Sequence, residues 1–194
     1  MNYIDEIRAY MPPTPEEQME KEAILDTIMR YGDAILDRTT LLAHMTSSGF
    51  VMNPELDKCL MVYHNIYDCW AWTGGHCDGD PDLLATAMRE AKEETGAEDF
   101  YPLTEQMLSL DMLTVENHYK RGKYVPSHIH INASYVLISE ETEHLRAKLD
   151  ENSGVSWIPA TSMDEISDEP DIIVVYKRLI RRARELKGLP PLDL

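Results

Sequence analysis

Three glutamates near the middle of the chain have the residue type and the spacing to hold a metal ion. Glu93 and Glu94 follow Glu90 by three and four positions, so on an α-helix all three side chains fall within an arc of roughly 100°. Like charges at these spacings destabilise an isolated helix by about 0.2–0.5 kcal/mol per pair. A divalent cation that prefers oxygen ligands reverses that sign. The spacing therefore predicts a carboxylate platform for Mg²⁺ or Mn²⁺.

The residues around the glutamates predict the helix that this platform needs. Asp80 suits the N-cap, Pro81 suits the first helical position, and Gly96 suits the stop. Arg89 precedes Glu93 by four positions, so the arginine is expected to hold that carboxylate in place. One mostly apolar stripe is expected to pack inward, at Leu84, Met88, Ala91 and Thr95.

This segment resembles the Nudix box, Gly-x5-Glu-x7-Arg-Glu-U-x-Glu-Glu-x-Gly-U, in which U is a bulky aliphatic residue. Three positions depart from the pattern, because Pro81 stands where the first Glu belongs and Ala91 and Ala97 are smaller than usual. The resemblance implies that the missing Glu supports the loop and helix rather than the metal. The matching positions are Gly75, Arg89, Glu90, Glu93, Glu94 and Gly96.

The resemblance also implies an activity and roles for the matching residues. The expected reaction is metal-dependent hydrolysis of a diphosphate bond in a nucleoside diphosphate linked to another moiety. Glu90 and Glu94 are expected to be metal ligands, Glu93 a ligand or the base, and the Gly75 carbonyl an extra ligand. Arg89 is expected to orient the carboxylates.

Many enzymes of this family take a further carboxylate, as ligand or base, from a loop outside the box. Glu151 and Glu116 are the candidates, and Glu151 precedes a short expected strand at 155–158.

A second polar pattern lies in an expected strand near residue 130. His128, His130 and Asn132 alternate with apolar residues and so share one strand face. Such a row suits the floor of a pocket that binds phosphate or a base, and the alternative is a half-exposed strand face. A zinc site is less favoured, because no cysteine or third histidine sits at ligand spacing. Two further residues, His64 and Trp72, are candidates for substrate binding, although structural packing explains each equally simply.

Composition limits the possible partners. The 194 residues carry a net charge of −17, which disfavours nucleic acid and anionic membrane as partners. Three cysteines without a CxxC pair favour a reducing compartment, and no apolar run approaches 18 residues. The sequence therefore predicts a cytoplasmic protein that acts on a small-molecule diphosphate.

Periodicity predicts an α/β/α sandwich with a mixed sheet and an N-terminal helical extension. Residues 1–40 look helical, with the capping-box spacing at Thr14–Glu17 and an apolar stripe at Ile24, Ile28, Tyr31 and Ile35. The extension is expected to pack over the sandwich or across a homodimer interface, and residues 41–194 form the catalytic domain. Short strands are expected at 50–52, 59–63, 70–72, 107–115, 127–138 and 155–158, and a helix at 172–187.

Two other functions remain open on the sequence. An isomerase of the isopentenyl-diphosphate type uses the same fold, and it needs a catalytic cysteine that faces a glutamate, for which Cys69 or Cys77 is available. A catalytically silent domain that senses a nucleotide sugar is the second. Such domains usually lose box glutamates, and all three are present here.

Overall fold

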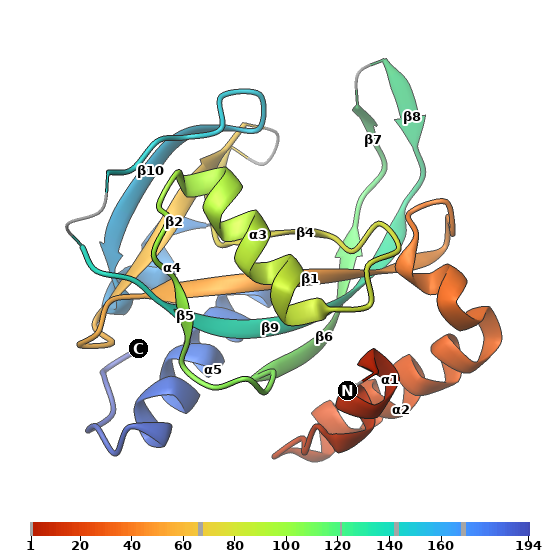
Figure 1. Ribbon diagram of the computed structural model, residues 1–194, viewed down its shortest axis with the longest axis horizontal. Helices are drawn as coiled ribbons and strands as arrows, with labels where there is room; N and C mark the ends of the chain where they lie inside the picture. The colour runs from red at the N-terminus through yellow and green to blue at the C-terminus, as the bar shows by residue number, and fades with distance from the viewer. Residues whose placement is uncertain (1, 66–67, 121, 142–143, 168–169) are drawn as a thin grey trace.

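Figure 1 shows the computed structural model of the chain, which describes residues 2–65, 68–120, 122–141, 144–167 and 170–194. Within these residues, eight strands form one sheet whose central path is β10-β2-β1-β9-β5. β1 (Ala43–Met52) runs parallel to β9 (His128–Ile138), whereas β1 is antiparallel to β2 (Lys58–His64). The sheet is therefore mixed, as the sequence predicts.

The remaining strands extend this sheet at its edges. β3 (Cys69–Ala71) pairs with β2, β4 (Thr73–His76) pairs with β1, and β6 (Ser109–Val115) pairs with β9. β5 is Tyr101–Pro102 and β10 is Asn152–Pro159. Three of the expected strands are longer in the structure: β1 begins seven residues before residue 50, β10 begins three before residue 155, and β2 extends one residue beyond each end of 59–63.

A separate hairpin of β7 (His118–Lys120) and β8 (Lys123–Val125) projects from the sheet between β6 and β9 (Figure 1). The sequence predicts a turn at Arg121-Gly122, and Arg121 lies outside the described residues.

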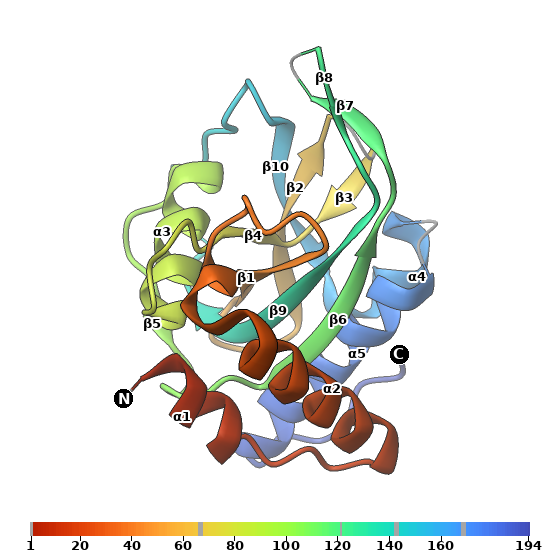
Figure 2. The same ribbon diagram turned by 90° about the vertical axis from the view of Figure 1, so that its right-hand side faces the viewer.

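Helices cover both faces of the sheet (Figures 1 and 2). On one face, α3 (Leu83–Thr95) packs with α1 (Tyr3–Ala9) and α2 (Pro15–Tyr31) in the larger core cluster. On the other face, α5 (Pro170–Leu186) and the short α4 (Met163–Ile166) form the second cluster. Short 3₁₀ turns, η1 (Gly32–Leu36) and η2 (Ala160–Ser162), connect these layers. The expected helix at 172–187 corresponds to α5, and its apolar side is buried at Tyr176, Leu179, Ile180 and Ala183.

The helix that carries the glutamates begins two residues later than the sequence predicts. Asp82, not Asp80, is the N-cap, and its side chain accepts a hydrogen bond from the Ala85 amide. Asp80 instead accepts a 2.9 Å hydrogen bond from the Asp82 amide, which leaves Pro81 in the preceding turn. The predicted stop is confirmed, because Gly96 ends α3 with a left-handed φ of 71°.

The buried face of α3 is also rotated relative to the prediction. Leu84 and Met88 are only partly buried, whereas Leu83 and Ala87 are fully buried. This rotation brings Glu94 onto the buried side, where its side chain lies between the helix and β4.

The N-terminal helices pack against the sheet of their own chain (Figure 2). Thr14 caps α2 as predicted, since its hydroxyl accepts a 3.2 Å hydrogen bond from the Glu17 amide. Ile24, Ile28 and Ile35 of the predicted stripe are buried in the larger core, whereas Tyr31 is 36% exposed. The expected dimer interface stays a prediction.

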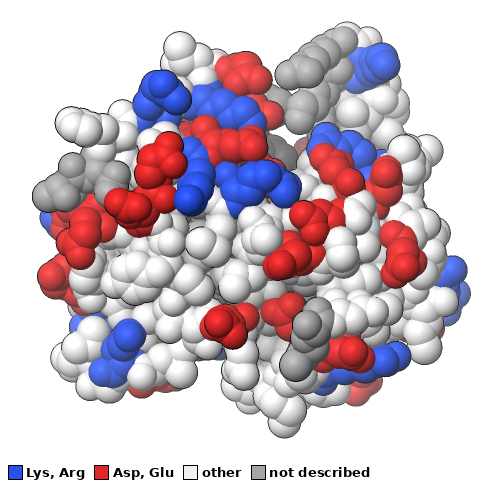
Figure 3. All heavy atoms as spheres, viewed as in Figure 1, with Lys and Arg blue, Asp and Glu red and all other residues white. Residues whose placement is uncertain are grey.

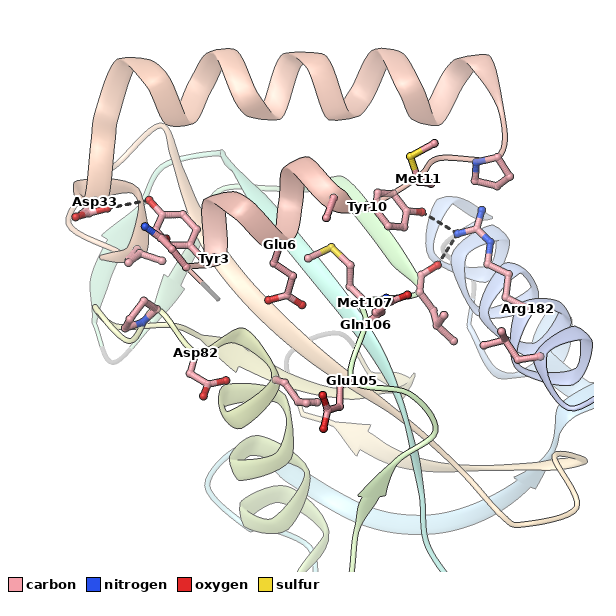
Figure 4. Close-up of a pocket in the computed structure, with 18 of the residues that line it drawn as sticks. Tyr3, Glu6, Tyr10, Met11, Asp33, Asp82, Glu105, Gln106, Met107 and Arg182 are labelled. Carbon is pink, nitrogen blue, oxygen red and sulfur yellow. Dashed lines mark hydrogen bonds between the residues drawn. The ribbon is translucent and has the colours of Figure 1, made fainter.

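A cavity of about 1240 Å³ lies between α1, the N-terminal end of α3 and α5 (Figure 4). Glu6, Asp82 and Glu105 line it together with several apolar side chains. Arg182 closes one end, where it donates a 2.9 Å hydrogen bond to the Tyr10 hydroxyl.

Candidate active site

Glu94 is a buried carboxyl group at the centre of the predicted platform. Its side chain is 5% exposed and accepts a 3.0 Å hydrogen bond from the Gly74 amide on β4. Burial raises the pKa of Glu94 to about 8, and the negative charge of nearby Glu90 acts in the same direction. A buried acid with so little compensating charge favours a bound cation.

Glu90 lies one helical turn earlier, against the backbone of β4. A Cβ on Gly75 would be 2.5 Å from the Glu90 carboxyl carbon, so a side chain there would displace this carboxyl group. Burial raises the pKa of Glu90, whereas the Arg89 guanidinium at 3.1 Å opposes this shift. Gly75 therefore serves as a bare backbone position that lets the Glu90 carboxyl approach the strand, whereas a Cβ on Gly74 would meet Ser48 of β1.

Glu93 is the exposed member of the platform and is joined to the loop before β10. Lys148 lies 3.4 Å from the Glu93 carboxylate and 2.9 Å from the Glu151 carboxylate. This lysine brings Glu151, predicted as an additional carboxylate, beside the box. Glu116 lies elsewhere, just after β6, one residue beyond Val115, which pairs with His128.

Arg89 contacts different carboxylates from the one expected. Its guanidinium lies 3.1 Å from Glu90 and 3.7 Å from Asp80, while Glu93 pairs with Lys148. The predicted Arg89–Glu93 pair is wrong, because the guanidinium turns back toward the loop before α3. Arg89 can still orient a carboxylate, and that carboxylate is Glu90.

The three polar residues predicted to share one face of β9 lie in two different environments. His128 and His130 point together, with their Nε2 atoms 3.1 Å apart. Asn132 is instead buried within the sheet, where its Oδ1 accepts hydrogen bonds from Thr46 and Ser48, each at 2.9 Å. Asn132 therefore ties β9 to β1 beneath the histidines.

Two more histidines join this pair. His44 on β1 and His76 on β4 lie within 5.0 Å of His130 between ring centroids. Neither sits at ligand spacing from His130 in the sequence, because β-sheet pairing brings together residues far apart in the chain. The register places His44 opposite His130, a contact that no local motif reveals.

The other two substrate-binding candidates lie apart from the histidine cluster. His64 ends β2 and pairs with Cys69 on β3 and Asn152 on β10. Trp72 packs edge-on against Tyr176 of α5, with ring centroids 5.2 Å apart, and its amide donates to the Tyr176 hydroxyl. Their predicted roles in binding substrate stay predictions.

Basic side chains accompany the acidic ones on the face over α3 (Figure 3). Arg89 and Lys148 supply positive charge beside the glutamates. The acidic chain thus has local cationic groups where an anionic substrate would meet the platform.

The family model described as NUDIX domain matches residues 43–179. This range covers most of the chain and contains the whole glutamate platform. The chain belongs to the NUDIX family. The sequence-based recognition is confirmed, and the family supports its class as a hydrolase of phosphoric anhydrides.

Solved structures confirm the Nudix fold at low sequence identity. A hydrolase of the NUDIX family from Clostridium perfringens aligns with a TM-score of 0.50 and 20% identity, over 71% of this chain and 95% of that one. The dihydroneopterin triphosphate pyrophosphohydrolase of E. coli aligns with a TM-score of 0.53 and 13% identity, over 70% and 94%. A NUDIX hydrolase from Listeria monocytogenes aligns with a TM-score of 0.51 and 15% identity, over 73% of this chain and 93% of that one. No curated protein matches the chain.

Proposed function

We propose that the chain is a metal-dependent Nudix hydrolase that cuts a diphosphate bond in a nucleoside diphosphate linked to another moiety. The observation that carries the proposal is the buried Glu94 carboxyl group beside the partly buried Glu90 carboxyl group, both held against the Gly74-Gly75 backbone on one side of α3. Few buried acidic pairs are stable without a cation or a shared proton.

The residues fit a hard divalent cation. Burial raises the pKa of both Glu90 and Glu94, so the chain alone does not compensate two negative charges there. Carboxylate and backbone carbonyl oxygens are the ligands that Mg²⁺ prefers. Glu90, Glu94, Glu93 and the Gly75 carbonyl are the proposed ligand set. When bound, Mg²⁺ or Mn²⁺ supplies charge neutralisation of the diphosphate and acidification of a water.

The surrounding side chains position these carboxylates and meet the substrate. Arg89 holds Glu90 at 3.1 Å and keeps its carboxylate aligned along α3. The Gly74 amide holds Glu94, and a charge-assisted bond of this type strengthens as the carboxyl ionises. Lys148 offers a positive charge at the edge of the platform for a phosphate oxygen.

The general base is proposed to be Glu151 or Glu93. Both carboxylates contact Lys148, which keeps them beside the platform and accessible, with side chains 30% and 48% exposed. An accessible carboxylate next to the reaction centre can accept a proton from the attacking water. Separate Glu→Gln variants distinguish them, because only loss of the base flattens the dependence of kcat on pH.

The substrate is proposed to extend from the glutamates toward the ends of β2 and β9. His64, His128, His130 and Trp72 are the proposed binding residues for the base, sugar or second phosphate. The diphosphate that is cut is proposed to lie at the glutamate platform.

The isomerase alternative has weaker support in the geometry. Cys77 is buried in the larger core, and burial raises its pKa to about 12, so this thiol is a poor acid and a poor nucleophile. Cys69 lies on β3 and contacts the Ser167 hydroxyl at 3.8 Å. The silent-sensor alternative is disfavoured because such domains usually lose box glutamates, and Glu90, Glu93 and Glu94 are retained.

The deciding experiment is a hydrolysis screen over dinucleotides, nucleotide sugars and nucleoside triphosphates with Mg²⁺, with products identified by mass. Cleavage between two phosphates is expected for at least one class. An allylic product without phosphate release identifies an isomerase, and tight binding without turnover identifies a sensor.

A cytoplasmic location is proposed on the cysteines. No disulfide joins the three, all of which lie in the described residues, and this fits a reducing compartment. Among the described residues, no helix has the length and apolar character needed to cross a membrane.

A further inference from the structure

Four histidines from three strands meet at one end of the sheet. His44 comes from β1, His76 from β4, and His128 and His130 from β9. The His44 ring centroid is 5.0 Å from those of His76 and His130, and 4.8 Å from that of His128. The register produces this meeting, because β1 places His44 beside His130 and pairs its next inward position, Thr46, with His76.

The ring nitrogens are close enough to share one ion. One nitrogen from each of His44, His76 and His130 lies within 4.8 Å of the other two. Nitrogens bound to one tetrahedral zinc ion, each about 2.0–2.1 Å from the metal, are about 3.3 Å apart. Metal binding therefore requires the three nitrogens to move closer together than they lie in this structure.

Hydrogen bonds orient two of the rings so that their lone pairs face inward. His44 Nδ1 lies 3.1 Å from the Thr40 carbonyl oxygen, and His128 Nδ1 lies 2.8 Å from that of Pro126. A carbonyl only accepts, so each Nδ1 carries the proton and each Nε2 carries a lone pair. Backbone carbonyls hold metal-binding imidazoles in this way.

The inward nitrogens have less hydrogen bonding than a packed polar cluster requires. His44 is 4% exposed, and its Nε2 has no hydrogen-bond partner among the described residues. Buried polar atoms are rarely left unpaired in native structures, and a bound ion is one of the explanations when they are. His128 Nε2 faces His130 Nε2 at 3.1 Å, so only one proton or one cation satisfies both atoms.

Burial favours the neutral form of His44 and His130, which is the form that binds metals. Burial, followed by the proximity of His76, His44 and His128, lowers the pKa of His130 to about 2. Burial also lowers the pKa of His44. A further positive charge, Arg38, is held in an ion pair with Asp78 beside the cluster.

We propose that His44, His76 and His130 bind one divalent transition-metal ion of the zinc or cobalt class, with His128 available as a fourth ligand. The site differs from the glutamate platform in its ligands, which are nitrogens, although His76 directly follows Gly75 in β4. Imidazole favours zinc, copper, iron and nickel, whereas carboxylates favour magnesium and manganese. The chain would then carry two metal sites, one with nitrogen ligands at the end of the sheet and one with oxygen ligands on α3.

The test is Co²⁺ binding to the full chain after treatment with a chelator and desalting. The wild type is expected to bind one equivalent with the visible absorption of a four-coordinate ion, and excess Mg²⁺ is expected to leave the spectrum unchanged. Zn²⁺ is expected to displace Co²⁺. His76→Asn and His130→Asn are each expected to weaken Co²⁺ binding at least about a hundredfold, beyond the loss usual for an outer-shell partner.

Matched controls separate this site from the platform and from surface histidines. His118→Asn, on the β7–β8 hairpin, and Glu94→Gln are expected to bind Co²⁺ as the wild type does. Thermal unfolding of each variant checks folding, and His76→Asn decides the matter if the His130 variant does not fold. The proposal is overturned if both histidine variants keep the wild-type spectrum, if Glu94→Gln abolishes it, or if the wild type binds no Co²⁺. Hydrolysis with Mg²⁺ is measured separately, so failure here leaves the proposed function standing.

Discussion

Gly75 approaches Glu90 so closely that any side chain at position 75 would collide with the carboxyl group. A Cβ there would lie 2.5 Å from the Glu90 carboxyl carbon and 2.7 Å from its Oε2. The glycine of the box is therefore explained by the space that the first glutamate of the platform occupies. The same contact couples β4 to α3, so the strand fixes where the carboxylate sits.

The first prediction follows from this contact. Gly75→Ala is expected to displace Glu90 and to lower kcat/KM with Mg²⁺ by at least about a hundredfold, on the scale of losing one well-placed electrostatic group. Gly75→Ala combined with Glu90→Asp shortens the carboxylate side chain and is expected to recover part of the activity. Steady-state kinetics of the two variants measures both effects. Near wild-type activity of Gly75→Ala would show that catalysis does not depend on the observed position of the Glu90 carboxyl group.

The second prediction concerns Glu94. Glu94→Gln keeps the size and the bond to the Gly74 amide but removes a charge. Hydrolysis is expected to fall by at least about a hundredfold, while the thermal midpoint stays equal or rises because repulsion with Glu90 is relieved. Kinetics and calorimetry on the same preparation check this, with Glu98→Gln, an exposed residue after the helix, as the control. A variant with normal turnover would remove Glu94 from the metal site.

Metal dependence and pH dependence of activity form the third prediction. Activity is expected to need millimolar Mg²⁺ or Mn²⁺ and to rise toward alkaline pH as a water is acidified. Rates are measured from pH 6 to 9 before and after exhaustive chelation. Full activity after chelation contradicts the proposal and leaves the glutamates as an ordinary helix surface.

The fourth prediction concerns stability without metal. The pKa of Glu94 is about 8 in the folded chain, against 4.5 as its ordinary value. Between these values the folded state binds more protons than the unfolded state, so the free energy of unfolding falls as pH rises. Urea unfolding of the chelated protein at pH 5, 6.5 and 8 measures this decline.

Two comparisons isolate the Glu94 contribution. Glu94→Gln is expected to gain stability over the wild type progressively from pH 5 to 8, because glutamine has no proton to lose. Saturating Mg²⁺ is expected to shrink this difference, since the ion favours the ionised wild-type carboxylate. A constant difference across the pH range would mean that Glu94 ionises normally.

The platform was predictable because its information is local. Glu90, Glu93 and Glu94 lie within one turn and a half of α3, so helical spacing alone places them on adjacent faces. The start of the helix was less predictable, because Asp80 and Asp82 are both good caps and only the structure shows that Asp82 caps the helix.

The histidine cluster was not predictable from spacing. His44 and His130 are 86 positions apart and meet only because β1 and β9 pair in parallel with a particular register. His128 and His130 were recognised as one strand face, since alternation is local. Their partners depended on strand order, which a single sequence does not specify.

The fifth prediction concerns the ion pair that joins the N-terminal helices to α5. The Glu17 carboxylate is 6% exposed and lies 2.6 Å from the Arg182 guanidinium. Glu17→Gln leaves a partly buried guanidinium without its charge partner and is expected to cost about 2 kcal/mol of stability. Glu16→Gln, on the exposed side of the same helical turn, is the matched control and is expected to change little. Urea unfolding of both variants measures the difference, and equal stabilities would mean that the pair contributes nothing net.

Removal of the whole extension gives the last prediction. Tyr3, Ile7, Ile24 and Ile28 are buried in the same core cluster as α3 and β9, so deletion of residues 1–40 uncovers the apolar face that they cover. An exposed patch of this kind promotes association. The truncated chain is therefore expected to aggregate or to change its oligomeric state, as light scattering measures, while Glu17→Gln in the full chain keeps the wild-type mass. A truncated protein with unchanged mass, solubility and hydrolysis would show that the extension is dispensable and that the remaining domain covers its own core.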